Sequence, residues 1–252
     1  MTFDPPTLLF IAATFALAGG VKGIIGMGLP TVSLALLTLV VDLPQAMALL
    51  LVPSFFTNLW QALVGGHLLV ILRRLWGFLL LACATVWIGA GWLTRIEQPL
   101  LLGLLGVVIA SYATLNLVGL RLQIAPGTER WLGPLAGIVN GLLTGLTGSF
   151  VVPGVLFMQS IGLQRDQLIQ AMGVLFMSST LALGVAMAGH RLLDGPQALV
   201  SAGALLPALL GMVLGQRLRR RLSESTFRRV FFVSLLVIGC YIALGALRRL
   251  LS

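Results

Sequence analysis

The chain alternates long apolar runs with short polar connectors, and two of the apolar runs are interrupted by clusters of glycine. The first interruption, Gly19 to Pro30, contains five glycines and lies inside an apolar stretch from about Leu8 to Val41. A related interruption runs from Gly141 to Pro153. Irregular backbone is tolerated at membrane depth only where protein or a water-filled cavity surrounds it. The pattern therefore predicts two broken helices in a membrane protein, an arrangement typical of transport sites.

The connectors of the first half predict a broken helix followed by three membrane spans. The broken helix consists of one piece from about Thr7 to Ala18 and a second from about Pro30 to Val41. Each piece has about 12 residues, or about 18 Å, and is shorter than a hydrocarbon core of about 30 Å. A re-entrant pair, or two short tilted passes, fits that length. The three spans that follow are Gln45 to Gly66, Leu75 to Thr94 and Leu100 to Leu120.

The second half repeats this order and the spacing of its punctuation. Its broken run is Leu132 to Gly162, and its three spans are Gln167 to Gly189, Gln197 to about Gln216, and Phe231 to Leu247. Residues of the two halves match at offsets of 122 or 123: Gly19, Gly23 and Gly26 with Gly141, Gly145 and Gly148, then Pro30 and Thr57 with Pro153 and Thr180. We expect an all-α polytopic protein with membrane repeats at 1–120 and 131–252, joined by a cytoplasmic connector at 121–130.

Arginine in the connectors predicts the topology, because short cytoplasmic loops are rich in Lys and Arg. If each broken run crossed the membrane once, the arginines would divide eight against seven. If each broken run goes in and returns, only Arg95, Arg191, Arg248 and Arg249 lie outside, and eleven face the cytoplasm: Arg73, Arg74, Arg121, Arg130, Arg165, Arg217, Arg219, Arg220, Arg221, Arg228 and Arg229. The second arrangement gives two repeats of inverted topology and places both termini outside the cytoplasm.

Composition agrees with a membrane protein and argues against several other classes. The chain is 58% hydrophobic and 9% charged, with a net charge of +9. Because the arginines lie in short loops between apolar spans, we expect no nucleic-acid partner. The N-terminus lacks the positively charged start of a signal peptide, so we expect the first span to be retained. Cys83 and Cys240 have no CxxC spacing, so we expect no metal and no cofactor.

The two breaks supply the candidate substrate site. A helix that restarts after a glycine bend offers free N–H groups and a partial positive charge to an oxyanion. Lys22 lies inside the first break, and an intramembrane lysine is a functional candidate, unless the bend is shallow and the lysine snorkels to an interface. Mid-span amide and hydroxyl groups can face a substrate path or join helices to one another. The candidate binding residues are Lys22, Gly23, Gly26, Gly28, Asn58, Thr144, Thr147, Gly148, Ser149 and Ser179.

Two histidines and one serine suggest further chemistry. His67 and His190 end equivalent spans and could take part in proton coupling, although interfacial structural histidines are common. Ser149 with His190 could form a nucleophile and base, but the chain has no GxSxG elbow. We therefore expect no enzyme activity and no catalytic residue.

The two glycine-rich breaks, each opening a half of about 120 residues, resemble the sulfite exporter TauE/SafE family of integral membrane proteins. Members often carry consecutive glycines at the break, where this chain has Gly26-Met27-Gly28 and Gly148-Ser149-Phe150. The resemblance implies passage of sulfite, sulfoacetate or a related organosulfur or carboxylate anion across the bacterial inner membrane. We expect a secondary transporter coupled to a proton or sodium gradient, with its site between the two broken helices and with a homo-oligomer possible; an anion channel is the alternative.

Overall fold

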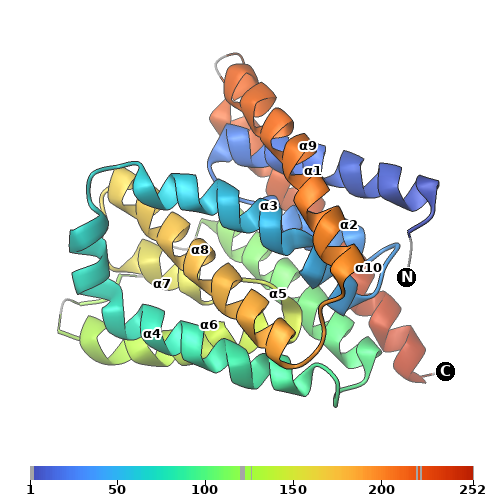
Figure 1. Ribbon diagram of the computed structural model, residues 1–252. Helices are drawn as coiled ribbons and strands as arrows, with labels where there is room; N and C mark the ends of the chain where they lie inside the picture. The colour runs from blue at the N-terminus through green and yellow to red at the C-terminus, as the bar shows by residue number, and fades with distance from the viewer. Residues whose placement is uncertain (1–2, 120–122, 126, 220, 222, 252) are drawn as a thin grey trace. The chain divides into compact units, whose positions relative to one another are not determined.

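The computed structural model describes residues 3–119, 123–125, 127–219, 221 and 223–251, and all the regular elements in this part of the chain are helices (Figure 1). The first five are α1 (Pro5–Ile25), α2 (Leu29–Leu37), α3 (Leu43–Leu63), α4 (Leu68–Trp92) and α5 (Gln98–Val118). The next five are α6 (Glu129–Thr147), α7 (Gly154–Ser160), α8 (Arg165–Gly189), α9 (Gly195–Arg219) and α10 (Glu224–Leu251). The order of one long helix, one short helix and three long helices occurs twice.

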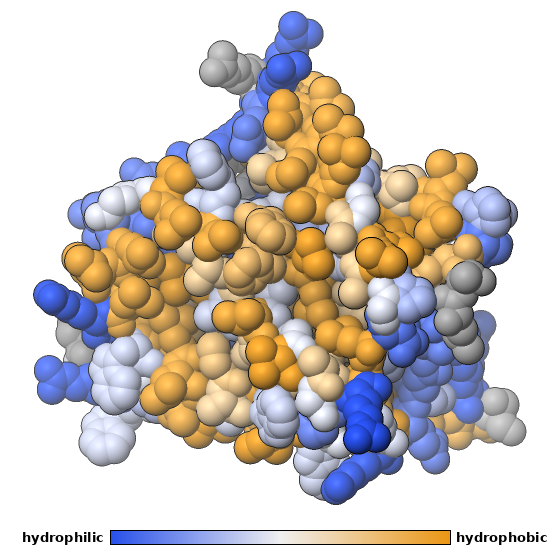
Figure 2. Space-filling view, viewed as in Figure 1, coloured by the Kyte–Doolittle hydropathy of each residue, from blue (hydrophilic) through white to orange (hydrophobic). Residues whose placement is uncertain are grey.

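Within the described residues, seven helices are long and apolar enough to cross a membrane: α1, α3, α4, α5, α8, α9 and α10. They confirm the predicted class, an all-α polytopic membrane protein. The face seen in Figure 2 is largely apolar, with hydrophilic groups gathered toward its edges. Large side chains such as Trp60, Trp76 and Leu199 are more than half exposed, as expected where lipid rather than water covers them.

The first break is narrower than the sequence predicts. α1 continues past Ala18 and includes Gly19, Gly20, Lys22 and Gly23, so the irregular segment is only 26–28. The predicted end of the first helix at Ala18 is therefore wrong, and so is the placement of Lys22 inside the break. Glycine costs a helix about 1 kcal/mol per residue, but in a membrane it also permits close helix contact. A Cβ atom at Gly19 or Gly23 would overlap a main-chain carbonyl of α9, which explains the glycines.

The irregular segment of the second break is also shorter than the sequence predicts. α6 runs through Gly141 and Gly145 to Thr147, and the irregular segment is 148–153. The two pieces of each broken helix are also unequal. α1 has 21 residues and α2 has 9, while α6 has 19 and α7 has 7. At 1.5 Å per residue, α1 is about 32 Å long and α2 about 14 Å, so the predicted pair of equal short pieces is wrong.

The chain folds into two compact units, each assembled from separate stretches of the sequence. Unit 1 comprises Met1–Pro53, Ile96–Gly119 and Leu192–Ser252, and unit 2 comprises Ser54–Arg95 and Leu120–Arg191. Each unit therefore takes helices from both predicted repeats. The repeat boundaries themselves, and the inverted orientation of the repeats, stay predictions. Arg121 and Arg220, both used in the topology argument, lie outside the described residues.

In unit 1, α1 packs on α9 through small residues spaced four apart. A Cβ atom at Gly19 would lie 2.9 Å from the carbonyl carbon of Ala208, and one at Gly23 would lie 2.9 Å from the main-chain nitrogen of Gln216. Added carbons at Gly211 and Gly215 of α9 would in turn overlap main-chain carbonyls of α1. The backbones of the two helices are therefore in direct contact, as small-xxx-small sequences allow.

In unit 2, α6 packs on α4 in the same register. A Cβ atom at Gly141 would lie 2.9 Å from the carbonyl carbon of Ala82, and one at Gly145 would lie 2.5 Å from the main-chain nitrogen of Ala90. Gly141 and Gly145 are the predicted equivalents of Gly19 and Gly23. Their partners Ala82 and Ala90 also precede Ala208 and Gln216 by the same number of residues, 126. The matching helix contacts inside each unit support an internal duplication.

α5 and α10, both in unit 1, make a reciprocal contact. A Cβ atom at Gly106 would lie 2.7 Å from the Gly239 carbonyl oxygen and 2.6 Å from the Ala243 nitrogen. A Cβ atom at Gly239 would lie 3.0 Å from the Gly106 carbonyl oxygen and 2.8 Å from the Ala110 nitrogen. Contacts in which residue i meets j and j meets i are characteristic of two-fold related surfaces. The last helix of each predicted repeat is thus paired with its counterpart.

A proline inside α3 is accommodated by a serine of α9. Pro53 has no N–H, so the Leu49 carbonyl loses its helical hydrogen bond. The Ser201 hydroxyl donates to this carbonyl at 2.8 Å, and the Val52 N–H donates to the Ser201 oxygen at 3.2 Å. Ser201 is 1% exposed, so its hydroxyl replaces a hydrogen bond that no water could supply.

Candidate functional site

The first break, in unit 1, begins at a left-handed glycine. Gly26 has φ of 81°, and its N–H donates to the Lys22 carbonyl at 2.7 Å, which closes the end of α1. Gly28, with φ of 105°, leads into α2, where Pro30 occupies the first turn. The Tyr112 hydroxyl donates to the sulfur of Met27 at 3.1 Å. The predicted restart near Pro30 is confirmed, and α5 helps to hold the segment between the two helices.

Lys22 and Gly23 belong to the last turns of α1 rather than to the irregular segment. The Lys22 side chain is 5% exposed, so protein and not lipid surrounds it. The alternative in which the bend is shallow and Lys22 snorkels to an interface concerns its depth in the membrane and stays a prediction. Gly23 lies against the main chain of α9 and has a packing role that explains its presence without a ligand.

The second break, in unit 2, begins with the same geometry. Gly148 has φ of 71°, and its N–H donates to the Thr144 carbonyl at 2.8 Å. Two threonines then hold Ser149 by its main chain. The Thr144 hydroxyl donates to the Ser149 carbonyl at 3.1 Å, and the Ser149 N–H donates to the Thr147 hydroxyl oxygen at 3.2 Å. The Thr147 hydroxyl hydrogen is itself directed to the Leu143 carbonyl at 2.6 Å. The Thr144 hydrogen and the Thr147 oxygen therefore position the loop, and the Ser149 side chain is the hydroxyl that this loop presents.

Asn140, which the sequence argument did not select, connects α6 to the start of α7. Its Oδ1 atom accepts the Gly154 N–H at 2.9 Å. This bond fixes the orientation of the amide, so the NH2 group is the end left to act as a donor. Asn140 is 0% exposed. The sequence did contain a signal for this residue, because Asn140 is an amide inside an apolar helix and directly precedes Gly141 of the glycine pattern.

Ser179 and Asn58 are both fully buried on neighbouring spans, α8 and α3. Ser179 lies one turn after Leu175 and Phe176, on the same face of α8. Those two residues reach the second break, since Phe176 is 6.1 Å from Phe150 between ring centroids and Leu175 lies against Gly154. α8 is therefore the span beside this break.

Unit 2 contains buried donors that have no hydrogen-bond partner among the described residues. They are Ser54 Oγ, Asn140 Nδ2, Ser149 Oγ and Ser179 Oγ. Such groups cost about 1–3 kcal/mol each when left unsatisfied, so native proteins contain few of them. All four are neutral hydrogen-bond donors, which is the chemistry that an oxyanion requires. The missing partners of these donors are a physical reason to expect Ser149 and Ser179 to contact a substrate. Asn140 is added to the candidate residues for the same reason.

The two histidines lie at opposite kinds of helix end in unit 2: His67 is the N-cap residue of α4, and His190 is the C-cap residue of α8. The His67 N–H donates to Gln170 Oε1 at 2.9 Å. The His190 ring lies 5.1 Å from the Trp87 ring, with Nε2 3.3 Å from the Trp87 carbonyl oxygen. Since Ser149 Oγ has no partner among the described residues, the structure does not form the Ser149 to His190 hydrogen bond that a nucleophile and base would need. Proton coupling through His67 or His190 stays a prediction.

Seven apolar spans and two glycine-broken helices, the second with buried donors beside its break, define a multi-pass membrane protein of the transporter class. The family model described as "Sulfite exporter TauE/SafE" matches residues 11–242, so the chain belongs to this family. No curated protein and no solved structure gives a match. The resemblance stated from the glycine breaks is confirmed, and the chain functions in transport across a membrane.

Proposed function

We propose that the protein is a secondary transporter of a small sulfur-containing or carboxylate oxyanion, such as sulfite or sulfoacetate. The observation that carries the proposal is the pair of buried donors at the second break, Asn140 Nδ2 and Ser149 Oγ, with Ser179 Oγ on the neighbouring helix α8. Hydrogen bonds to a charged acceptor are about twice as strong as neutral ones. An anion that reaches these donors therefore satisfies groups that the protein otherwise leaves unpaired at a cost.

The loop around Ser149 is prepared for this role in the absence of ligand. Thr144 and Thr147 fix the Ser149 main chain, and Gly154 fixes the Asn140 amide. Little reorganisation is then required when the substrate arrives, and less binding energy is lost to ordering. Neutral donors also let the anion leave again, because no buried ion pair has to be broken.

The first break lies in unit 1, and Lys22 is its charged residue. Lys22 is the single lysine of the chain and is buried at the end of α1. We assign to it the attraction of the anion into the protein interior. The prediction that the two breaks border one common site stays a prediction, as do coupling to protons or sodium and an inner-membrane location with both termini outside the cytoplasm.

The test is flux of radiolabelled sulfite, sulfoacetate and a small carboxylate in proteoliposomes that contain the purified full-length chain. We expect saturable flux of at least one of these anions that responds to an imposed pH or sodium gradient. Flux that ignores every ion gradient would favour a channel. The absence of flux for all three anions would refute the proposal.

Two substitutions test the site itself. Ser149→Ala removes a donor that has no protein partner among the described residues, and we expect transport at subsaturating substrate to fall about tenfold or more, with stability unchanged or slightly higher. Asn140→Asp keeps the oxygen that accepts the Gly154 N–H but replaces the NH2 donor with a carboxyl oxygen, and we expect a comparable or larger loss. Ser160→Ala is the matched control, because that buried hydroxyl already donates to the Phe157 carbonyl at 2.7 Å. Wild-type flux in both site variants would show that the donors do not contact substrate.

A further inference from the structure

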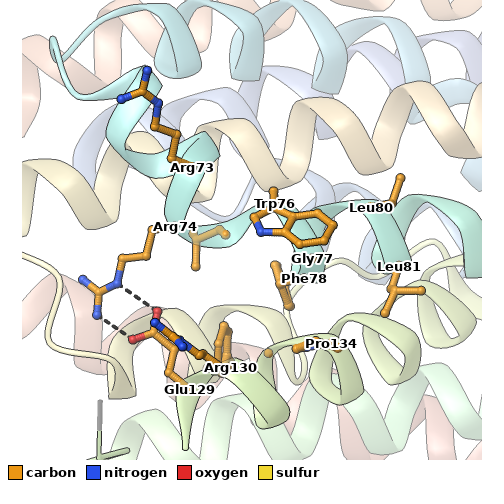
Figure 3. A pocket seen from close by; sticks show the side chains of 13 residues that line it. Arg73, Arg74, Trp76, Gly77, Phe78, Leu80, Leu81, Glu129, Arg130 and Pro134 are labelled. Atoms are coloured by element: carbon orange, nitrogen blue, oxygen red, sulfur yellow. Dashed lines mark hydrogen bonds and ion pairs between the residues drawn. The ribbon is translucent and has the colours of Figure 1, made fainter. Parts of the chain in front are cut away.

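A groove lies between residues 73–81 of α4 and the first turns of α6, within unit 2 and distinct from the second break (Figure 3). Its volume is about 810 Å³, within the range of small-molecule sites. Gly77 of α4 lies opposite Pro134 of α6 in the groove. A Cβ atom added at Gly77 would be 3.7 Å from the ring of Pro134. Figure 3 shows an Arg74 to Glu129 pair at one end, with Trp76, Leu80, Leu81 and Pro134 following along the groove.

The charged end has an excess of positive charge. Arg74 donates two hydrogen bonds to Glu129, each at 2.8 Å, and a third to the Ile161 carbonyl at 2.6 Å. This pairing neutralises the negative charge of Glu129 and occupies the Arg74 guanidinium. Arg73 and Arg130 also line the groove, and both are exposed. The four side chains together carry a formal charge of +2, which the protein leaves for a ligand or for solvent.

The other end of the groove is apolar and open to the surroundings. Trp76 is 67% exposed and Leu80 is 60% exposed. Both lie on α4, a helix that is long and apolar enough to span a membrane. Tryptophan and arginine in neighbouring turns are typical of the headgroup level of a bilayer. The groove therefore runs from the headgroup level toward the hydrocarbon region.

We infer that this groove binds one anionic phospholipid. The phosphate lies beside Arg130, and one acyl chain follows Trp76 and Leu80. The Arg73 side chain points away from Arg130 (Figure 3) and adds positive charge from the other side of Arg74. Basic pockets between membrane helices are suited to anionic headgroups. A free phosphate would use only the charged end of the groove, and an apolar peptide would use only the other end. A lipid matches both ends, and its binding does not depend on the identity of the transported anion.

The experiment is native mass spectrometry of the delipidated full-length protein in detergent, titrated with phosphatidylglycerol or phosphatidylcholine. We expect phosphatidylglycerol to bind more tightly than the zwitterionic lipid. In the double variant Arg73→Gln/Arg130→Gln, its affinity should fall on the order of 10- to 30-fold, because both basic side chains attract the anionic headgroup. Arg95→Gln/Arg191→Gln is the matched control, since it removes the same charge from unit 2 outside the groove.

A second pair of measurements separates a lipid from a free phosphate. Trp76→Ser should weaken phosphatidylglycerol binding, and glycerol phosphate at the same concentration should not displace the lipid. The inference is overturned if the two lipids bind equally, if the control variant loses as much affinity as the groove variant, or if glycerol phosphate competes as well as the intact lipid. Because all substituted side chains are exposed, we expect the variants to keep the wild-type melting temperature, which the same preparation can report.

Discussion

The packing of α6 on α4 gives the sharpest quantitative prediction for this fold. In Gly141→Ala, the new methyl group would meet the Ala82 carbonyl group, whose carbon atom lies 2.9 Å from the added Cβ position. A backbone carbonyl cannot rotate away as a side chain can, so the two helices must separate. Overpacking of this kind costs about 1–3 kcal/mol. Since the contact is with a fixed backbone group, the cost belongs to the upper part of this range, about 2–3 kcal/mol. The higher helix propensity of alanine returns about 1 kcal/mol, so we expect a net loss of about 1–2 kcal/mol.

A loss of this size is measurable as a change in melting temperature. For a chain of about this length, 1 kcal/mol corresponds to roughly 2–4 °C. We therefore expect Gly141→Ala to melt about 2–8 °C below wild type in thermal-shift measurements on the detergent-purified protein. Gly19→Ala, at the equivalent position of unit 1, should lose a similar amount, because its added carbon would also lie 2.9 Å from a carbonyl carbon, that of Ala208.

The control for these variants is a helical glycine with open space around it. A Cβ atom at Gly203 in α9 would have no neighbour within 4 Å. Gly203→Ala should therefore be neutral or stabilising by about 0.5–1 kcal/mol. A melting temperature for Gly141→Ala equal to or above wild type, or an equal fall for Gly203→Ala, would refute the assignment of the glycine pattern to close helix packing.

Three further predictions concern polar contacts and backbone geometry. Ser201→Ala leaves the buried Leu49 carbonyl without its donor and should destabilise the protein by about 1–3 kcal/mol, seen as a lower melting temperature; an unchanged value would mean that the Pro53 region relaxes. Glu129→Gln breaks an ion pair whose arginine is 36% exposed and should cost less than about 1 kcal/mol, so a large fall in the same assay would contradict this expectation. Gly148→Ala must adopt a left-handed conformation at a cost of about 1–2 kcal/mol, whereas Gly148→Asn should lose less, and equal melting temperatures for the two variants would argue against a strained position.

The sequence predicted the class of the protein and the position of its breaks. Apolar runs long enough for a bilayer depend only on composition and length, so the spans could be recognised without any tertiary contact. The restart near Pro30 follows from local chemistry, because proline is favoured in a first helical turn. Pro153 instead is the N-cap residue directly before α7. The ordered glycines indicated the family and the internal repeat, whose packing is visible in the matching contacts of α1 with α9 and of α6 with α4.

The extent of the helices and the roles of individual polar groups required the tertiary structure. Gly19 and Gly23 would be expected to end a helix by their intrinsic propensity, and only the neighbouring α9 backbone makes a helix favourable there. In the same way, nothing local distinguishes Thr144, which holds the loop, from Ser149, whose hydroxyl is left as a donor. That difference depends on where each hydroxyl finds an acceptor after folding. Local chemistry therefore determined which segments span the membrane and where they break, while contacts made only after folding decided how far each helix extends and which donors stay without a partner among the described residues.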